Sequence, residues 1–224
     1  MSESSYLHVH YSEERRPTTG YPQLLAQHLV SLFGLGANAR LLDVGSGRAE
    51  VSRGFHDAGL SVTCLDHSPA GQQFAAVAEL DFVQHDISSR EPLPFESSSY
   101  DIVFCKSLIE HLAEPLPFLQ DCHRVLNPGG RLIVLTPDWQ ANHKIFFDDV
   151  THVKPFAVES LRQALEMAGY RDVSSETFRQ LPVTWRWPSV NLLSACLAPF
   201  VPVRTKNKFF RWSRELMICG SGLK

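Results

Sequence analysis

Glycine and acidic residues stand where the first short apolar run of the sequence ends. Asp43 and Val44 close that run, and Gly45, Ser46 and Gly47 follow directly. Glycine at a strand-to-helix turn lets the backbone approach a ligand closely, and the helix that follows offers unpaired N–H groups. Ligands of open parallel sheets bind beyond the carboxyl ends of the strands. The spacing therefore predicts a ligand-binding turn at residues 43–47.

The turn alone does not separate a dinucleotide site from other ligand sites. A dinucleotide fingerprint needs a third glycine three residues after Gly47, and the chain has Glu50 there. An acidic side chain facing a pyrophosphate would repel it. The carboxylate of Asp43 likewise suits a cationic ligand better than a phosphate. These residues argue against a dinucleotide site.

Two more acidic residues stand at the ends of the next apolar runs. Asp66 closes one run and Asp86 follows another. The carboxyl ends of parallel strands meet at one edge of a sheet, so Asp43, Asp66 and Asp86 are expected to gather there. Three such carboxylates repel one another unless a ligand uses them. The pattern favours a ligand site over a tight turn without a ligand.

Apolar runs alternate with helical patterns up to residue 136. Strands are expected at 40–44, 61–65, 81–84, 100–105 and 131–136. Helices are expected at 23–33, 50–58, 68–79 and 117–126. This alternation predicts an α/β fold, a doubly wound parallel sheet with helices on both faces.

The later part of the chain changes character. A helix at 158–168 and strands at 172–178 and 215–219 are expected, whereas residues 179–213 are rich in Trp, Pro and basic side chains. We expect one domain over 1–224, with an N-terminal helical cap at 1–39, a core at 40–137 and a substrate-side insertion or lid at 179–213. The mixture of cations and aromatics in that insertion suits a phosphorylated or lipid-linked ligand, a sugar, a membrane surface or a lid packed on the sheet.

Charge is distributed unevenly along the 224 residues. The chain carries a net charge of −3, but residues 1–150 are acidic and residues 151–224 are basic. The basic part either meets an anionic partner or complements the acidic part of the same chain. Nucleic acid is the least suitable partner, because the body of the protein is acidic.

The cysteine pattern excludes two classes of protein. The five cysteines are scattered and form no C-x-x-C pair, so no zinc site, no other metal site and no disulfide scaffold is predicted. The start, MSESSY, is polar and unlike a secretory signal, and the longest apolar stretch is interrupted by prolines. We expect a cytoplasmic protein without a transmembrane segment; peripheral membrane contact stays open.

Over residues 38–137 these motifs resemble the class I S-adenosylmethionine (SAM)-dependent methyltransferases. The resemblance is to the small-molecule branch, methyltransferase types 11 and 23. It is carried by Asp43-x-Gly45-x-Gly47, by Asp66, by Gln84-His85-Asp86-Ile87, by Leu108-Ile109-Glu110-His111-Leu112 and by Arg124-Val125-Leu126-Asn127-Pro128-Gly129-Gly130. It implies a Rossmann-like, seven-stranded methyltransferase sheet, SAM as the cofactor and S-adenosylhomocysteine as the product.

The resemblance also implies which residues hold SAM. Asp66 would accept hydrogen bonds from the ribose hydroxyls, and Asp86 would accept one from the adenine amino group. Ile87 would contact the adenine ring. His67 either stacks on adenine or is a surface histidine. Ala49 replaces a glycine that the family often has. The full set of implied cofactor residues is Asp43, Gly45, Ser46, Gly47, Asp66, His67, Asp86, Ile87, Lys106 and Ser107.

Two histidines are candidates for a general base. His152 lies in a Thr-His-x-x-Pro-Phe segment similar to one that follows the fifth strand in bacterial methyltransferases, and Asp148 or Asp149 could orient it. The alternative is a loop residue that caps the next helix. His111 is the second candidate, or it packs under the site. Cys105 lacks the Pro-Cys context of a methyltransferase nucleophile and is expected to be a buried thiol.

Three functions remain compatible with the sequence. The first is SAM-dependent O-methylation of a small-molecule or glycan- or lipid-linked acceptor, which requires a base for the acceptor hydroxyl. The second is N-methylation of a small amine. The third is a methyltransferase-like protein that binds SAM without turnover. Incubation with labelled SAM, which detects transfer, separates the third from the other two.

Overall fold

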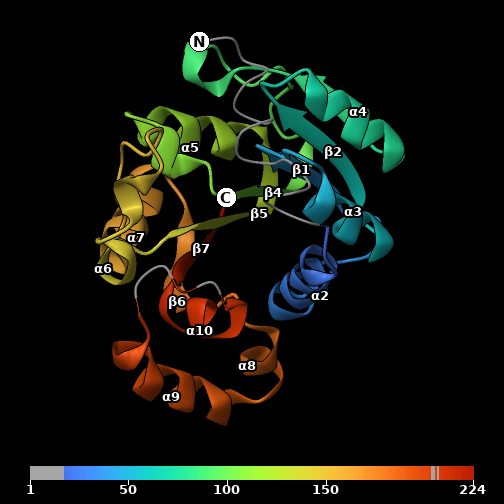
Figure 1. Ribbon diagram of the computed structural model, residues 1–224. Coiled ribbons are helices and arrows are strands. Elements are labelled where there is room, and N and C mark those ends of the chain that lie inside the picture. Colours follow the sequence, from blue (N-terminus) through green and yellow to red (C-terminus); the bar gives the residue numbers. More distant parts are fainter. Residues whose placement is uncertain (1–17, 203–204, 206) are drawn as a thin grey trace. The chain divides into compact units, whose positions relative to one another are not determined.

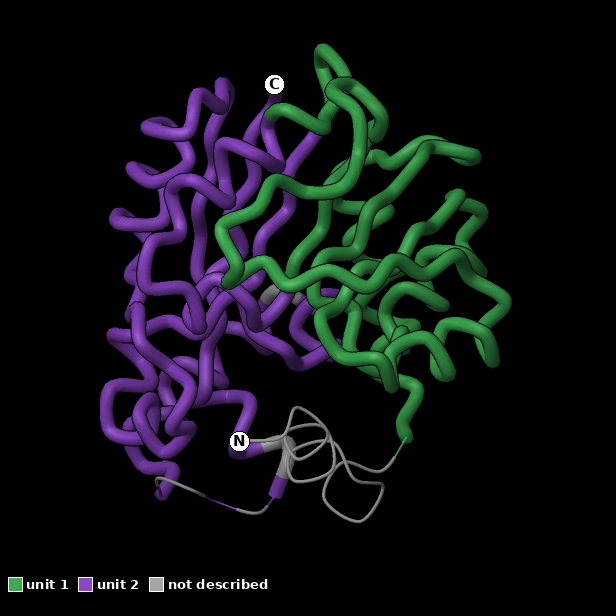
Figure 2. The backbone as a smooth tube through the Cα atoms, turned by 90° about the horizontal axis from the view of Figure 1, so that it is seen from above, with its two compact units in different colours: residues 1–105, 124–130 green, residues 106–123, 131–224 purple. Residues whose placement is uncertain are grey.

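The computed structural model describes residues 18–202, 205 and 207–224 (Figure 1). The polar start of the chain and the first part of the expected N-terminal cap lie outside the described residues. Clustering of the backbone separates two compact units, which Figure 2 colours differently. Unit 1 holds residues 1–105 and 124–130, and unit 2 holds residues 106–123 and 131–224.

Unit 1 is a parallel sheet with alternating helices. Its elements are α2 (Tyr21–Phe33), β1 (Arg40–Val44), α3 (Glu50–Asp57), β2 (Ser61–Asp66), α4 (Ala70–Val77), β3 (Asp81–Gln84), η1 (Ile87–Ser89) and β4 (Tyr100–Lys106), whose last residue belongs to unit 2. The strands lie in the order β3-β2-β1-β4, and each neighbouring pair is parallel. In register, Val44 of β1 lies opposite Leu65 of β2 and Cys105 of β4, so these strands end at one edge.

The core of unit 1 is formed by strand residues that are buried on both faces. Leu41, Leu42 and Val44 of β1 are fully buried, as expected for a central parallel strand. Phe55 of α3 packs edge-to-face on Phe104 of β4, with 5.1 Å between ring centroids. These contacts fix α3, and therefore the turn that precedes it, against the sheet.

Unit 2 combines antiparallel strands with short helices. Its elements are η2 (Ile109–His111), α5 (Pro115–Val125), β5 (Leu126–Pro137), α6 (Trp139–Asn142), η3 (Phe146–Asp148), α7 (Val158–Met167), β6 (Arg171–Phe178), α8 (Pro182–Arg186), α9 (Pro188–Leu197), η4 (Ala198–Phe200), α10 (Lys208–Arg214) and β7 (Met217–Leu223). The last two residues of α5 and the start of β5, up to Gly130, belong to unit 1. β7 pairs antiparallel with both β5 and β6.

The strand order is β3-β2-β1-β4-β5-β7-β6, a seven-stranded mixed sheet in an α/β protein. This confirms the expected fold class, and four of the first five strands begin where the sequence placed them. β5 is the exception, because it starts at Leu126 rather than at residue 131. β7 covers Met217–Leu223 rather than 215–219. The single-domain organisation stays a prediction.

The segment expected as an insertion is helical in its described part. α8, α9, η4 and α10 occupy most of residues 182–214, although Val203, Arg204 and Lys206 lie outside the described residues. Among the described residues, no helix is long and apolar enough to cross a membrane.

Candidate functional site

The glycine turn joins β1 to α3 in unit 1. Gly45 and Gly47 have positive φ angles of 78° and 52°. The N–H groups of Gly45 and Ser46 donate to the carbonyl oxygen of Leu65, at 2.8 and 3.1 Å. A Cβ added at Gly47 would meet nothing within 4 Å, so the turn is open on that side. The turn therefore has the backbone that glycine favours and leaves space beside it, as the sequence predicted.

Ala49 shows why a third glycine would suit this turn. It is the N-cap of α3 and has a left-handed backbone, with φ 55° and ψ 18°. A residue other than glycine costs on the order of 1 kcal/mol in that conformation. The methyl group is buried with Cys64 and Ala75, and this packing offsets part of the strain.

Asp66 fastens the turn to the end of β2. Its Oδ2 accepts a hydrogen bond from Gly47 N at 2.9 Å, and its Oδ1 accepts one from Ser68 N, also at 2.9 Å. The imidazole Nδ1 of His67 lies 3.4 Å from Oδ1, and the His67 side chain is 44% exposed. Asp66 is buried, so these donors replace the water that its carboxylate has lost.

Asp43 and Asp86 also receive hydrogen bonds from the protein. Ser52 Oγ donates to Asp43 Oδ2 at 2.6 Å in the core. Ser88 donates to Asp86 Oδ1 through its hydroxyl at 2.7 Å and its N–H at 2.8 Å, and these bonds lower the pKa of Asp86. Each of the three aspartates therefore has hydrogen-bond donors within the protein. Ligand binding at this edge stays a prediction.

The remaining predicted cofactor residues fall into two places. Ile87 opens η1 in unit 1 and is partly buried. Lys106 and Ser107 belong to unit 2, where Ser107 has a positive φ of 53° and its N–H donates to the carbonyl oxygen of Leu135 at 2.8 Å.

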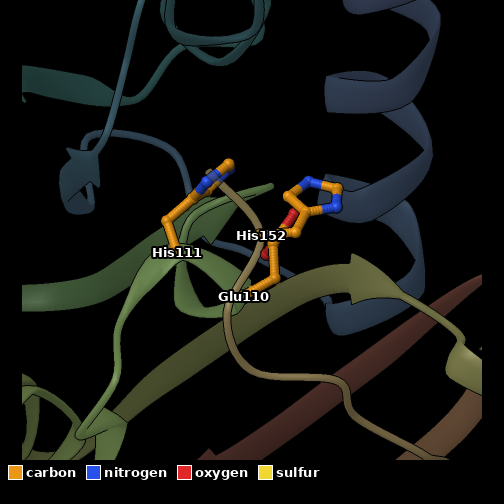
Figure 3. A group of neighbouring side chains, drawn as sticks. All are labelled: Glu110, His111 and His152. Carbon is orange, nitrogen blue, oxygen red and sulfur yellow. The ribbon is translucent and has the colours of Figure 1, made fainter. Parts of the chain in front are cut away.

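A second group of polar side chains lies within unit 2. Glu110 and His111 come from η2, and His152 comes from the loop before α7 (Figure 3). One ligand atom of each lies within 4.8 Å of the others. Both histidines were predicted site residues, and the structure brings them together.

His152 is held by a backbone carbonyl and by two aromatic rings. Its Nδ1 lies 2.7 Å from the carbonyl oxygen of Phe146. A carbonyl oxygen only accepts, so Nδ1 carries the proton and, in the neutral ring, Nε2 carries the lone pair. Ring centroids of Phe146 and His111 lie 4.6 and 4.8 Å from that of His152. The side chain is 15% exposed, so Nε2 has limited access to solvent.

The tautomer of His111 follows from the hydrogen bonds of Thr151. Thr151 Oγ1 donates its only proton to Asp149 Oδ1 at 2.6 Å. His111 Nδ1 lies 2.9 Å from that hydroxyl oxygen and 3.2 Å from the Thr151 carbonyl oxygen, and both can only accept. His111 therefore donates from Nδ1, which leaves the lone pair on Nε2.

Asp149 supports both histidines. Its Oδ2 lies 3.9 Å from His152 Nε2, and its Oδ1 accepts from Thr151. Burial opposes its ionisation, but the hydrogen bonds from Thr151 and the nearby imidazoles hold the pKa of Asp149 below its ordinary value. Of the two aspartates predicted to orient His152, Asp149 lies beside its ring.

Glu110 is a fully buried acid beside these histidines. Its Oε2 accepts from Thr136 Oγ1 at 2.9 Å, whereas its Oε1 is buried without a hydrogen-bond partner. Burial raises the pKa of Glu110 to about 7. Its backbone carbonyl accepts from the N–H groups of Val153 and Lys154, at 2.9 Å each, and so anchors the loop that carries His152.

One alternative from the sequence is wrong, and some residues of the site were not predicted. His152 does not cap the next helix, because α7 begins at Val158 with Ala157 as its N-cap. Glu110, Thr151 and the Phe146 carbonyl were not predicted as parts of the site. Only Glu110 offered a signal, as an acidic residue inside an apolar run.

Among the described residues, this cluster is the one place where candidate metal ligands lie close enough together to bind an ion. Glu110, His111 and His152 could hold a divalent cation, although the sequence predicted no metal. The cysteines offer no such site: all five are free thiols, and Cys105 is fully buried in β4 as expected. Burial raises the pKa of Cys64 to about 12, which keeps that thiol protonated and unreactive.

A hollow of about 410 Å³ in unit 1 lies away from the glycine turn. Ser61, Val62 and Asp81 line it, at the amino ends of β2 and β3. The glycine turn and Asp66 stand at the carboxyl ends. The hollow is therefore separate from the predicted ligand edge.

Comparison with known sequences places the core of the chain in one family. Residues 42–134 match a family model described as a methyltransferase domain. The ubiquinone biosynthesis O-methyltransferase of Xanthomonas oryzae pv. oryzae is 35% identical over 104 residues, which cover 45% of this chain and 44% of that relative. The chain therefore matches less than half of the length of this relative.

Solved structures share the fold over most of the chain. A SAM-dependent methyltransferase from Archaeoglobus fulgidus aligns with a TM-score of 0.68 and 20% identity, covering 98% of this chain and 100% of that one. The second is a phosphoethanolamine N-methyltransferase from Haemonchus contortus, solved with phosphomonomethylethanolamine and S-adenosylhomocysteine. It aligns with a TM-score of 0.68 and 17% identity, and the alignment covers 100% of this chain and 61% of that one. The sequence motifs, the strand order and the matched domain agree. Residues 42–134 of the chain therefore form a methyltransferase domain within the shared α/β fold.

Proposed function

We propose that this protein transfers a methyl group from SAM to a hydroxyl group of a small-molecule acceptor. The matched methyltransferase domain supports the reaction class, and the name of the Xanthomonas relative supports an oxygen acceptor. The observation that carries O-methylation is the fixed tautomer of His152, because the carbonyl of Phe146 leaves the lone pair on Nε2. A hydroxyl acceptor needs such a base.

The glycine turn and the neighbouring aspartates fit SAM. Space beside Gly47 admits a ligand against the backbone. Each oxygen of Asp66 accepts one hydrogen bond from the protein and retains acceptor capacity for the ribose hydroxyls. Both bonds from Ser88 go to Oδ1 of Asp86, which leaves Oδ2 for the adenine amino group. Ile87 would contact the ring, and His67 would stack on it.

The other cofactor assignments rest on the family resemblance. Asp43, Gly45 and Ser46 would lie at the amino-acid end of SAM. Lys106 is the last residue of β4, the strand next to β1, and Ser107 follows it. SAM supplies an electrophilic methyl group on a sulfonium, and S-adenosylhomocysteine remains after its transfer. The protein has to orient the acceptor and remove its proton.

His152 would take the proton of the acceptor hydroxyl on Nε2. The charge that then develops on the imidazole is stabilised by Asp149, whose Oδ2 lies 3.9 Å from Nε2, and by the carbonyl that holds Nδ1–H. His111 has the same tautomer and is the alternative base. Alignment of the reactants supplies the larger part of the rate, roughly 7–11 kcal/mol, and the base adds to it.

The acceptor is expected to have an apolar part. Phe147, Val150 and Val153, which flank His152 in the chain, are 60%, 84% and 51% exposed. Large exposed side chains of this kind next to a site suit an apolar or lipid-linked substrate.

An N-methyltransferase acting on a small amine, and a protein that binds SAM without turnover, are the alternatives. We place the enzyme, as one domain over 1–224, in a reducing cytoplasm, because its five cysteines are free thiols.

Calorimetry with S-adenosylhomocysteine tests the cofactor assignment. Asp66→Ala should weaken binding by roughly 1.5–3 kcal/mol, since it removes a charged acceptor of the ribose hydroxyls. Asp81→Ala is the matched control, because this exposed aspartate lies at the opposite end of β3. Wild-type binding weaker than about millimolar would contradict the methyltransferase proposal. Equal affinity of wild type and Asp66→Ala would contradict the role of Asp66 alone.

Transfer of labelled methyl groups tests the acceptor class. Phenols, sugars and amines of matched size would be offered with labelled SAM, and products would be separated by chromatography. Label on hydroxyl compounds supports the proposal. Label confined to amines would favour the N-methyltransferase. Tight binding without transfer to any class would favour a binding protein.

A further inference from the structure

The helix α9 turns its larger apolar side chains toward solvent. Leu192, Leu193 and Leu197 are 72%, 57% and 38% exposed, and Phe200 of the following η4 is 83% exposed. Their spacing puts them on one face of the helix, which continues into η4. These four residues are called the α9 apolar face below.

The opposite side of α9 is the buried one, and it is less apolar. Ser194 is 2% exposed, and Val190 and Ala198, four residues before and after it, are partly buried. An ordinary surface helix buries its leucines and exposes its serines. α9 does the reverse, so its packing within the described part of unit 2 does not explain its leucines. Contiguous exposed apolar side chains of this kind mark an interaction surface.

The stretch of chain that contains the α9 apolar face is rich in cations. Residues 179–214 contain seven Lys and Arg residues and no Asp or Glu. Arg186 and Arg211 are exposed cations within this stretch, and Arg211 pairs with Glu215 just after it, at 2.7 Å. The Arg186 guanidinium lies 6.0 Å from the ring centroid of Trp187, which is itself 57% exposed. Exposed leucine, phenylalanine and tryptophan with arginine and lysine are typical of helices that lie in a membrane interface.

We propose that residues 179–214 bind the surface of an anionic lipid membrane, with α9 lying in the plane of the interface. The α9 apolar face would enter the boundary between headgroups and acyl chains, and the cations would meet the lipid phosphates. α9 has ten residues and the described helices include no membrane span, so the segment lies on the membrane and does not cross it. The proposal is independent of the methyl-transfer assignment.

Charge complementarity selects the membrane over a second copy of the chain. An isologous contact through the α9 apolar face would bring two stretches of seven cations together, and the one carboxylate next to each stretch, Glu215, already pairs with Arg211. Like charges across an interface are unfavourable. An anionic bilayer offers both the apolar layer and the opposite charge.

Flotation with lipid vesicles tests the proposal on the full-length protein. Vesicles of phosphatidylcholine with 30% phosphatidylglycerol would be compared with pure phosphatidylcholine, at low and high salt. We expect binding to the anionic vesicles that weakens as salt rises. Leu192→Gln/Leu193→Gln should reduce partitioning by at least about tenfold, because two buried leucines are lost from the interface.

Met167→Gln is the matched control, since Met167 is 68% exposed on α7, outside the segment. Circular dichroism and thermal unfolding would show that the variants fold equally. Equal partitioning of the double variant and wild type, or no binding to anionic vesicles, would overturn the proposal. A dimer that sediments without lipid and is lost in the double variant would overturn it in favour of self-association.

Discussion

At the scale of single residues, backbone carbonyls determine which nitrogen of each site histidine is available. The Phe146 carbonyl oxygen holds His152 Nδ1–H, and Thr151 holds His111 Nδ1–H. A histidine fixed in this way presents Nε2 in one direction without a rearrangement during the reaction. The same arrangement orients a metal-binding histidine, so base and metal ligand have to be separated by experiment.

The first prediction concerns His152 as a general base. His152→Ala should lower turnover by roughly 10²–10⁴-fold with little change in S-adenosylhomocysteine affinity. Initial rates with labelled SAM would measure turnover, and calorimetry would measure the affinity. His143→Ala is the control, since His143 is an exposed histidine of the same unit.

A chelator distinguishes the two roles of the cluster. With His152 as base, EDTA leaves the rate unchanged. Loss of activity in EDTA, restored by a divalent cation, would assign Glu110, His111 and His152 to a metal instead. Normal turnover in His152→Ala would leave alignment of the reactants as the mechanism.

The second prediction concerns Glu110, whose pKa burial raises to about 7 from an ordinary 4.5. Between these values the unfolded chain loses its proton while the folded protein keeps it. Stability is therefore lost as pH rises through this window, by up to about 3 kcal/mol. Glu110→Gln keeps an acceptor for Thr136 but cannot ionise.

Urea unfolding at pH 5 and pH 7.5 measures this effect. The free energy of unfolding of wild type should fall relative to that of Glu110→Gln between the two pH values. Glu159→Gln, at an exposed position on α7, should behave as wild type. A difference between Glu110→Gln and wild type that stays constant with pH would show that Glu110 ionises in the folded protein as it does in the unfolded chain.

At the scale of elements, buried parallel strands were the most predictable part. β1 and β3 have the predicted bounds, because a short apolar run between turn residues is compatible with few secondary structures other than a buried strand. The glycine turn and Asp66 were predicted for the same reason, because glycine and aspartate are recognisable where an apolar run ends. β7 was displaced, because Ser221 and two glycines give Met217–Leu223 no continuous apolar pattern.

Elements held by long-range contacts could not be predicted from local pattern. The four short helices after β6 were expected only as an insertion, because prolines and aromatic residues obscure helical periodicity there. The Phe146 carbonyl and Thr151 bind the histidines through backbone or hydroxyl groups, which carry no mark of that role in a sequence. Their placement depends on how the loop before α7 folds against Glu110.

The third prediction concerns the glycines of β7. A Cβ added at Gly222 would lie 2.7 Å from Tyr170 Cβ, and Tyr170 is buried with its hydroxyl bonded to the Leu119 carbonyl oxygen at 3.0 Å. Neither backbone nor ring can retreat freely. Gly222→Ala should therefore destabilise the protein by roughly 1–3 kcal/mol.

Gly36→Ala is the control for this substitution. A Cβ added at Gly36 meets nothing within 4 Å. Alanine also reduces the conformational freedom of the unfolded chain, so the stability of the variant should equal that of wild type or rise slightly. Urea midpoints of the two variants would be compared. Equal stability of Gly222→Ala and wild type would mean that β7 and Tyr170 separate more easily than their packing indicates.

At the scale of the whole molecule, the boundary between the two units runs through continuous elements. The division falls inside β4 after Cys105, inside α5 after His123 and inside β5 after Gly130. Unfolding of either unit would break the hydrogen-bonded elements that continue into the other. We therefore expect the units to unfold together, as the single-domain prediction requires.

The tryptophans allow a direct test of this cooperativity. All four, Trp139, Trp185, Trp187 and Trp212, belong to unit 2, whereas the glycine turn, Asp66 and Asp86 belong to unit 1. S-adenosylhomocysteine at about 100 times its dissociation constant should stabilise the folded state by about 2.7 kcal/mol. With cooperative unfolding, the tryptophan fluorescence transition of unit 2 shifts by this full amount.

Fluorescence and circular dichroism would be followed together in urea, with and without the ligand. Coincident transitions that shift equally support one cooperative domain. The same ligand concentration should shift both transitions of Asp66→Ala much less, because binding is weakened. A circular dichroism transition that splits, with the tryptophan signal unmoved by ligand, would show that unit 2 unfolds independently. The cofactor residues of unit 1 would then be stabilised without the His111–His152 cluster of unit 2.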